Sequence, residues 1–297
     1  MPGDSAFASV SLLLHADGAN GSTTLTDQSI NALVPSALGG AQLSTAQKRY
    51  GTASLLSGQS AGAFARYASN PAFGFGSGDF TLEASIYMTG GSGTDRNLLD
   101  FRDANGSDTM TWFIGTSNRL CIWTGALSGD AGPSLSQGIW YDVALTRASG
   151  VFRAFVDGVL VWSASPSVDF GANRPLGVGG AVYAGGVGIS LLPAYIDEVR
   201  ITKGLARYTS NYTPAGPFPN GAYAISGTVR DDADLPASRT VRAYYRATGA
   251  LAGSAVSDAA TGAYELGTLT ADECSVLFLD DAAGAVYNDR VLRVTPG

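Results

Sequence analysis

Hydrophobic and polar residues alternate along most of this chain with a period of two, which is typical of half-buried β-strands. The clearest run is Phe80–Met88, in which every second residue from Phe80 is apolar, while Thr81, Glu83 and Ser85 lie between them. No segment shows a convincing helical period, so the pattern predicts an all-β protein. The further strands that it predicts up to residue 202 are Val10–His15, Ser54–Leu56, Ala63–Ala68, Asn97–Phe101, Met110–Gly115, Leu120–Thr124, Trp140–Arg147, Phe152–Val156, Val159–Ser163 and Tyr195–Thr202.

Turn-forming residues separate these strands. Asp157-Gly158 lies between two of them and predicts a two-residue hairpin, because a type I′ turn requires a positive φ at both positions. Further along, Thr209–Gly221 contains three prolines and reads as a linker.

The linker divides the chain into two expected domains. We expect the first over residues 1–215, a Pro/Gly linker over residues 216–221, and the second over residues 222–297. The second is near the size at which a hydrophobic core alone gives marginal stability, so packing against a neighbour would help it. Its predicted strands are Ala222–Arg230, Arg239–Arg246, Leu251–Asp258, Ala263–Leu269, Ser275–Asp280 and Ala285–Val294.

Charged residues are scarce, at 14% of the chain against roughly 25% in an ordinary soluble domain. The formal net charge is −7 at pH 7, whereas a nucleic-acid-binding surface needs clustered Lys and Arg. We therefore expect no nucleic-acid partner. Lysine and glutamate usually cover the exposed faces of long helices, so their scarcity here also favours β structure.

The chain carries no predicted targeting or membrane segment. Asp4 stands where a secretory signal would have a basic residue. Pro175–Ile196 is uncharged but broken by glycines, so we expect strands around a glycine loop and no membrane insertion. Cys121 and Cys274 are far apart in sequence and have neither a disulfide framework nor metal-ligand spacing. They read as two small buried hydrophobic residues, and the protein as one made in a reducing cytoplasm.

Several motifs in order resemble a known family. NPAFGFGSGDFTLEASIY (Asn70–Tyr87) is similar to a strand signature of laminin-G-like, concanavalin A-like jelly rolls, although Ser85 stands where that family commonly has Trp. WYDVALTR, FVDGVLV and YIDEVRITKGLARY follow in the family's order, and LLLHADGANGSTTLTDQS fits its opening. The resemblance covers nearly all of residues 8–218. It implies a concanavalin-like jelly-roll sandwich for the first domain.

The second domain resembles a different family. ISGTVRDDADLPASRTVRAYYRATGALAGSAVSDAATGAYEL (Ile225–Leu266), followed by VLFLDD, is similar to carboxypeptidase-regulatory-like modules. This resemblance implies a small Ig-like or prealbumin-like β-sandwich. The pairing of the two modules resembles bacteriophage virion proteins, chiefly tail-associated ones, and that step rests on family analogy alone.

Catalytic groups are too few for the usual glycosidase or hydrolase chemistry. Retaining glycosidases need two carboxyl groups about 5–5.5 Å apart, and the expected first domain contains only Glu83 and Glu198 as glutamates. Asp197 and Glu198 are adjacent, so on a regular strand they face opposite sides. His15 is the one histidine, and it reads as a hydrogen-bonded structural residue at a strand end. We therefore expect no enzymatic activity and no required cofactor.

A structural calcium ion is one expectation for the acidic turns. Ca²⁺ takes oxygen ligands from carboxylates and carbonyls, and relatives of this fold hold one near the sandwich edge. The candidate ligands are Asp17, Asp27 and Asp197. The alternative is that Asp17 and Asn20 make Asx-turns and that Asp197 caps a bulge.

The tryptophans suggest where a glycan could bind. Trp140 and Trp162 lie in strongly apolar strands, and Trp112 shares a face with Met110 and Ile114, so all three are expected in the core. In Leu120–Thr124, by contrast, Trp123 lies on the side opposite Leu120 and Ile122. Trp123 is therefore the expected stacking residue for a sugar, and the other candidates are Phe113, Arg119 and Asn118. The alternative is that a loop or a partner subunit covers this face.

Together these points predict a non-enzymatic, tail-associated structural protein of a bacteriophage virion. Its partners would be other virion proteins, copies of itself in a homo-oligomer, and a cell-surface glycan through host recognition. The alternatives are a capsid decoration protein and a glycan-binding adhesin of a bacterial surface.

Overall fold

The computed structural model describes residues 3–103, 110–125, 127–183, 186–231, 233–279 and 290–297. It divides into two compact units. Ser9–Phe218 form the first, and the described residues before Ser9 join Pro219–Gly297 in the second. The expected first domain began at residue 1, but Asp4 donates its backbone N–H to the carbonyl of Gly221 at 2.8 Å. The N-terminal segment therefore belongs with the second unit.

Eight strands of the first unit form one sheet, in the order β13-β12-β11-β6-β17-β4-β3, with β1 also paired to β17. All of these pairings are antiparallel. The strands are β1 (Val10–Leu14), β3 (Gln42–Ser44), β4 (Ser54–Ser57), β6 (Phe80–Met88), β11 (Trp140–Ala148), β12 (Val151–Val156), β13 (Val159–Ala164) and β17 (Ala194–Lys203).

A second, seven-stranded sheet follows the order β10-β9-β8-β7-β14-β5-β2. The chain leaves β14 for a short hairpin, β15 (Ala181–Tyr183) with β16 (Gly186–Ile189). The strands of this sheet are β2 (Ser36–Leu38), β5 (Phe64–Asn70), β7 (Arg96–Asp100), β8 (Met110–Ile114), β9 (Leu120–Thr124), β10 (Leu127–Ala131) and β14 (Arg174–Val178).

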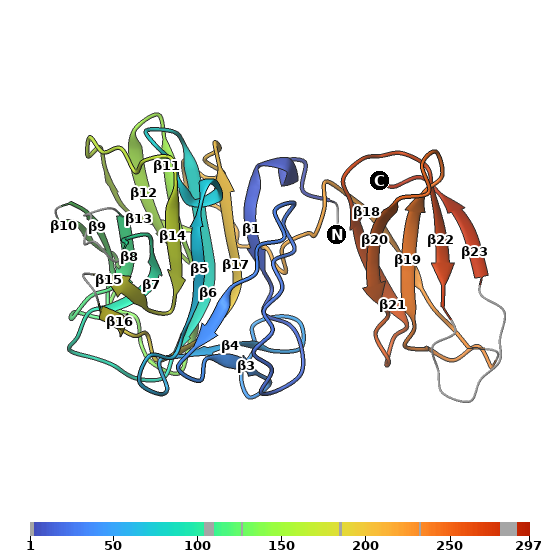
Figure 1. Cartoon of the computed structure of the whole chain (residues 1–297), viewed down its shortest axis with the longest axis horizontal. Coiled ribbons are helices and arrows are strands. Elements are labelled where there is room, and N and C mark those ends of the chain that lie inside the picture. The colour runs from blue at the N-terminus through green and yellow to red at the C-terminus, as the bar shows by residue number, and fades with distance from the viewer. Residues whose placement is uncertain (1–2, 104–109, 126, 184–185, 232, 280–289) are drawn as a thin grey trace. The chain divides into compact units, whose positions relative to one another are not determined.

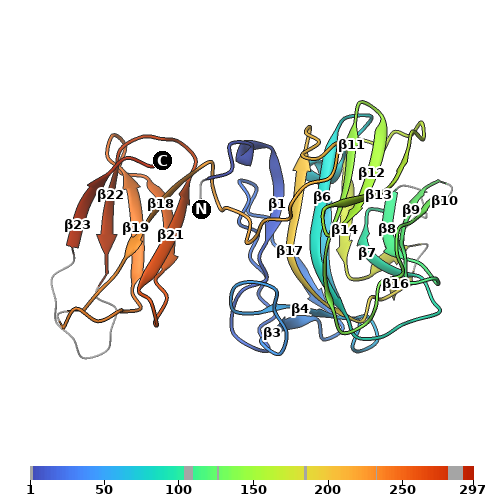
Figure 2. The ribbon, with the colours of Figure 1, turned by 180° about the vertical axis from the view of Figure 1, so that it is seen from behind.

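The two sheets are layers of one sandwich (Figure 1, and from behind in Figure 2). Inward-facing residues of both sheets form a single core, which contains Leu82 and Ile86 of β6 together with Trp112 and Ile122 of the other sheet. The period-two pattern of the sequence accounts for this core, because successive side chains of a strand point to opposite faces. The all-β, concanavalin-like jelly-roll prediction is confirmed.

The predicted Asp157-Gly158 hairpin is present, since both residues have a positive φ, 48° and 77°. Glycine is also required here for space. A Cβ on Gly158 would lie 1.9 Å from the carbonyl oxygen of Tyr212. The segment that was expected to be a free linker therefore runs close over this hairpin, and up to Phe218 it belongs to the first unit.

From Pro219 onwards, the regular elements among the described residues of the second unit are strands. Its core contains Ile225, Val241, Leu266 and Val276. Two 3-10 turns, Phe7–Ser9 and Pro71–Phe73, are the helical elements of the described residues, and none of these residues forms a helix long and apolar enough to cross a membrane. The strands are β18 (Tyr223–Thr228) with β21 (Ala263–Thr268), and the sheet β20 (Leu251–Val256), β19 (Thr240–Tyr245), β22 (Cys274–Phe278) and β23 (Arg290–Val294).

Candidate functional site

The predicted glycan face lies on the outer side of the seven-stranded sheet. In β8 and β9, Phe113 pairs with Cys121 and Thr111 pairs with Trp123, so the two aromatic residues are diagonal neighbours on the face away from the core. The alternation read from the sequence therefore places Trp123 on the expected face. Phe113 is 8% exposed, whereas Trp123 is half-buried. Trp123 is thus the accessible aromatic of the pair.

Polar side chains adjoin Trp123 on the same face. Asp100 pairs with Thr111 across β7 and β8, and its Oδ2 accepts from the Thr111 hydroxyl at 3.2 Å and from the Asn97 amide at 3.0 Å. Arg102 donates its Nε to the same Oδ2 at 2.9 Å. Burial raises the pKa of the Asp100 carboxyl, and the Arg102 guanidinium opposes that rise. The result is an arginine, 15% exposed, held in place by a buried carboxylate.

The other two glycan candidates lie in the turn between β8 and β9. Asn118 has a φ of 60°, and its Oδ1 accepts from Nη2 of the buried Arg96 at 2.6 Å. Asn118 therefore has a structural contact that its sequence context did not reveal. Arg119 is exposed. Whether either residue touches a sugar stays a prediction.

The cysteine beside this face is buried and free. Burial raises the pKa of the Cys121 thiol to about 11, and the nearby Asp130 carboxylate adds to the rise. Since the thiolate is the reactive form, Cys121 behaves as the small buried hydrophobic residue that was expected.

Two of the predicted calcium ligands stabilise separate loops. Asp17 accepts from the backbone N–H of Thr52 and, at 2.9 Å, from the hydroxyl of the same residue. Asp27 is buried, and its two oxygens accept from the backbone N–H groups of Leu13 at 2.9 Å and Leu33 at 2.8 Å. Asp17 thus bonds to a residue distant in sequence and makes no local Asx-turn here, whereas Asp27 also accepts from the backbone N–H of Ser29 at 2.9 Å, two residues on, which is an Asx-type contact.

Asp197, the third predicted ligand, sits at a β-bulge of β17. The register of β17 against β6 shifts between Asp197 and Arg200, and Glu198 has a φ of 49°. Asp197 Oδ2 accepts from the backbone N–H groups of Arg49 at 2.8 Å and Tyr50 at 3.1 Å. Burial raises the pKa of Asp197 to about 7. The described residues bring no three His, Cys, Asp or Glu side chains together for a metal, so these carboxylates do not form one calcium site, and calcium binding stays a prediction.

The two residues with potential acid–base chemistry are bonded to each other. His15 Nδ1 lies 2.6 Å from Glu198 Oε1, and both side chains are buried. The other oxygen of Glu198 accepts from the backbone N–H of Phe218 at 2.8 Å. The histidine follows β1, as expected for a structural residue at a strand end. The pair joins β1, the bulge and the segment that ends at Phe218.

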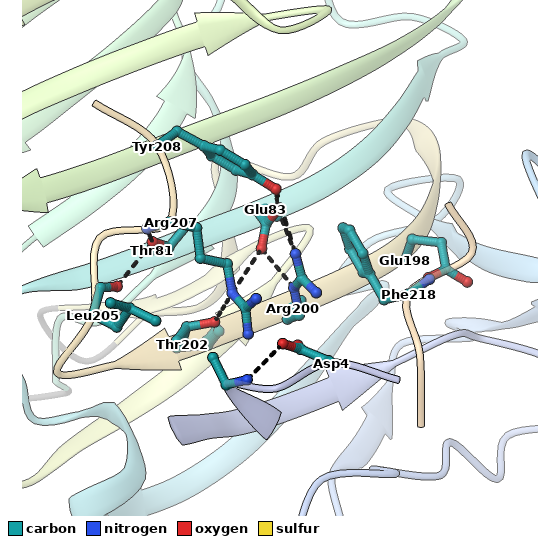
Figure 3. A network of polar contacts seen from close by, with 12 residues as sticks. Asp4, Thr81, Glu83, Glu198, Arg200, Thr202, Leu205, Arg207, Tyr208 and Phe218 are labelled. Carbon is teal, nitrogen blue, oxygen red and sulfur yellow. Dashed lines mark hydrogen bonds and ion pairs between the residues drawn. The ribbon is translucent and has the colours of Figure 1, made fainter. Parts of the chain in front are cut away.

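That segment, residues 205–218, covers part of the outer face of the eight-stranded sheet and is called the roof here. Figure 3 shows the contacts beneath it. Arg200 donates Nε to Glu83 Oε2 at 2.6 Å and Nη2 to Oε1 at 2.9 Å. Tyr208 of the roof donates its hydroxyl to Glu83 at 2.7 Å, and the Phe218 ring lies 3.7 Å from the Arg200 guanidinium carbon. The roof is therefore anchored on a buried ion pair.

A small pocket opens between the roof and the sheet. Its lining includes the side chains of Glu83, Ser85, Asp142 and Glu198 from the sheet and Tyr212 from the roof. Glu83 is ion-paired, Glu198 is bonded to His15, and Asp142 accepts from the Ser85 hydroxyl at 2.5 Å. The sequence did not reveal this pocket, because the roof was read as a linker.

Two tryptophans are not where the sequence placed them. Trp112 is fully buried as expected, but Trp140 lies on the outer face of the eight-stranded sheet, half-buried and outside the core. Trp162 is only partly buried and packs against the core from its edge. In β11 the residues Tyr141 and Val143 face the core, so Trp140 shares the outward parity of Asp142. The alternation in the sequence therefore already indicated that Trp140 faces outward.

Comparison with known proteins agrees with the fold. Residues 60–206 match the family model described as the Concanavalin A-like lectin/glucanases superfamily. No curated protein matches the sequence.

Among solved structures, the binding domain of Paraclostridial Mosquitocidal Protein 1 is 12% identical with a TM-score of 0.51, over 97% of this chain and 76% of that one. A Trypanosoma rangeli sialidase in complex with sialic acid is 16% identical with a TM-score of 0.50, and 67% of this chain matches 31% of the sialidase. This chain therefore spans about a third of that enzyme. Such low identities show the fold alone.

The fold occurs in binding domains and in chains of enzymes, so fold alone does not separate the two functions. The family match and the two-sheet sandwich nevertheless agree on the architecture. Over residues 60–206 the sequence is similar to the Concanavalin A-like lectin/glucanases superfamily, and the first unit has the jelly-roll sandwich architecture of that fold.

Proposed function

We propose that this protein is a non-enzymatic structural component of a bacteriophage virion, associated with the tail, that displays its lectin-like domain towards a cell-surface glycan. The virion role is supported by the sequence resemblance of the tandem, a laminin-G-like module followed by a carboxypeptidase-regulatory-like one. The lectin role is supported by the concanavalin A-like domain itself.

One observation carries the proposed glycan binding. Trp123 is half-buried on the outer face of the seven-stranded sheet, next to Thr111 and within the same patch as Asp100 and Arg102. Ligand sites combine an apolar surface with a few fixed polar groups. An indole ring suits the C–H face of a sugar.

The absence of catalysis is part of the proposal, and the state of the acidic groups supports it. Both oxygens of Glu83 accept from Arg200. Glu198 is bonded to His15 and to the backbone of Phe218. A general acid or base needs a carboxyl group that is placed against the substrate and has a matched pKa, and these two are instead used to stabilise the bulge and the roof.

Binding is tested on the full chain with a glycan microarray. We expect selective binding to bacterial surface saccharides that falls at least tenfold in Trp123→Ala and stays unchanged in Val34→Ala, a control side chain that is 87% exposed in the same unit. Equal binding by Trp123→Ala and the wild type would place any glycan elsewhere. Release of reducing sugar from a bound saccharide would refute the non-enzymatic part.

The virion role needs a separate measurement. Mass spectrometry of purified particles should find the protein, and antibody labelling in electron microscopy should place it on the tail. Labelling of the capsid would favour a decoration protein, and absence from particles would refute the virion role while leaving glycan binding intact.

A further inference from the structure

The outer face of the eight-stranded sheet is divided by the roof into a covered and an uncovered part. Thr81 accepts from the backbone N–H of Arg207 at 2.8 Å, and its hydroxyl donates to the carbonyl of Leu205 at 3.0 Å. Glu83 is bonded to Tyr208. Because outward residues of β6 follow at every second position, the next outward residues after Glu83 are Ser85, at the pocket, and then Tyr87.

An ion pair marks the boundary of the covered part. Arg49 Nη2 lies 2.7 Å from Asp142 Oδ2, and Asp142 pairs with Ser85 across β11 and β6. Tyr87 is one outward position beyond this boundary. The residues paired with Tyr87 on the two neighbouring strands are Trp140 and Tyr195.

These three side chains form one row across three adjacent strands, called the aromatic row here. The Tyr87 and Trp140 ring centroids are 5.6 Å apart, and those of Tyr87 and Tyr195 are 6.0 Å apart. All three residues are half-buried. Within the described part of the chain, no hydrogen bond joins the two phenol hydroxyls or the indole N–H to another residue. The row therefore combines accessible ring surface with polar groups that bond to none of the described residues.

Polar pairs flank the aromatic row on both sides. On one side are Arg49 and Asp142. On the other, Gln59 donates its amide to the Thr89 hydroxyl at 2.9 Å, and both of these residues are exposed. The apolar surface is thus a narrow strip between hydrogen-bonding groups.

The size of the strip decides which ligand it suits. A stable protein interface buries about 800 Å² on each partner. An aromatic side chain presents about 150–250 Å², so three half-buried rings expose less than about 300 Å². That area is too small for the core of a protein interface and is close to what a few sugar rings cover. The rings are tilted by 53° and 72° to each other, so they suit separate faces of a bent chain and do not form one flat platform.

We propose that the aromatic row is a second carbohydrate-binding site, for a short neutral oligosaccharide, on the sandwich face opposite Trp123. The sugar C–H faces contact the rings of Tyr87, Trp140 and Tyr195, and the sugar hydroxyls bond to the unpaired phenol and indole groups and to Asp142 and Gln59 at the margins. The inference rests on the proposed lectin role but uses a different sheet and different residues.

The test uses the full chain and a set of neutral probes: short oligomers of glucose, galactose and N-acetylglucosamine, titrated by isothermal calorimetry. We expect at least one probe whose affinity falls at least tenfold in Trp140→Ala and in Tyr195→Ala. The matched control is Ile139→Ala, an apolar side chain next to Trp140 that is 50% exposed. The control should bind as the wild type does.

Two further variants test the contribution of one hydroxyl group without a change in folding, and the independence of the two sites. Tyr87→Phe keeps the ring and removes one hydroxyl, so we expect a loss of about threefold to tenfold with unchanged thermal unfolding. Trp123→Ala should leave binding at the aromatic row intact.

The outcomes distinguish the two sites. If Trp123→Ala removes all binding while Trp140→Ala and Tyr195→Ala bind normally, the second site is refuted and the proposed function stands. If no probe binds the wild type, or if the row variants lose only attachment to other virion proteins, the aromatic row is not a carbohydrate site. A probe lost in the row variants and retained in Trp123→Ala supports it.

Discussion

The ion pair between Glu83 and Arg200 gives the most direct test of how the roof is held. Both side chains are about 95% buried, with side-chain exposures of 4% and 5%. The pair is bidentate, and the Tyr208 hydroxyl donates to the same carboxylate. Replacing Arg200 by Met removes the guanidinium beneath the roof and leaves the Glu83 carboxylate in place.

The expected cost follows from burial. Breaking a buried pair by removing one partner costs about 3–5 kcal/mol, because the remaining charge is desolvated without compensation. The Tyr208 hydroxyl still bonds to Glu83, and Arg207 Nε lies 4.0 Å from it, so we expect Arg200→Met near the lower end, at about 3 kcal/mol. Loss of the Arg200 contact with the Phe218 ring adds about 0.5–2 kcal/mol.

Removing both charges should cost much less than removing one. Replacing a buried pair by apolar residues of similar volume is often neutral or stabilising. We therefore expect Glu83→Leu combined with Arg200→Met to be within about 2 kcal/mol of the wild type. Because each single change is expected to cost about 3 kcal/mol or more, the coupling energy of the double-mutant cycle should then be about 4 kcal/mol or more.

Tryptophan fluorescence isolates the relevant unit. All four tryptophans of the chain lie between Ser9 and Phe218, so urea unfolding followed by this signal reports on the jelly roll and not on the second unit. Limited proteolysis between residues 205 and 218 reports on the roof directly. Arg66→Met, at an exposed arginine, is the control and should change the free energy of unfolding by no more than about 0.5 kcal/mol.

Two results would refute the reasoning. One is a decrease of less than about 1 kcal/mol in the free energy of unfolding of Arg200→Met. That is what an exposed ion pair contributes, so it would mean that the roof does not exclude water from this pair. A double variant that is as destabilised as the sum of the single ones would mean that the two charges are not energetically coupled.

Three other variants test separate features. Burial raises the pKa of Asp197 from 3.8 to about 7, so between these pH values the folded protein keeps a proton that the unfolded chain has lost. The free energy of unfolding should therefore fall as the pH rises through about 4 to 7. In Asp197→Asn, the free energies of unfolding measured at pH 5 and pH 7 should differ less than in the wild type. Asp27→Ala leaves the buried backbone N–H groups of Leu13 and Leu33 without their acceptor, and urea unfolding should show a loss of at least about 2 kcal/mol. Val256 is 67% exposed on β20, at one end of its sheet, so Val256→Arg should reduce any homo-oligomer seen by light scattering without changing the melting temperature.

The sequence predicted well which face of its sheet a strand residue occupies. Phe80–Met88 is a strand with the predicted bounds, and the predicted outward side of Trp123 follows from the same rule. Trp140 was assigned to the core because its strand is strongly apolar overall, although its position in the alternation puts it on the outward side. Asp142 two residues later marks the outward side, so consistent use of alternation places Trp140 outside as well.

The roof could not be predicted in the same way. Its prolines and glycines have the composition of a linker, and a local pattern does not show what a segment packs against. Tyr208 and Tyr212 stack at 3.5 Å, and the backbone N–H of Tyr212 donates to the carbonyl of Gly158. The contact of Tyr212 with Gly158 joins residues that are distant in sequence. A charged residue in the middle of each of two adjacent strands, Glu83 and Arg200, was the available sign that something must cover this face.

The roof also bears on the proposed non-enzymatic role of this face. By covering Glu83, it places the carboxylate in an ion pair with Arg200 whose partners are all protein groups. The same covering ends before Tyr87, so the surface left accessible there consists of aromatic rings whose hydroxyl and indole groups bond to none of the described residues. The Glu83 carboxylate is thus used for stability. The chemistry that remains accessible is ring contact and neutral hydrogen bonding, which suits a sugar that is bound and released unchanged.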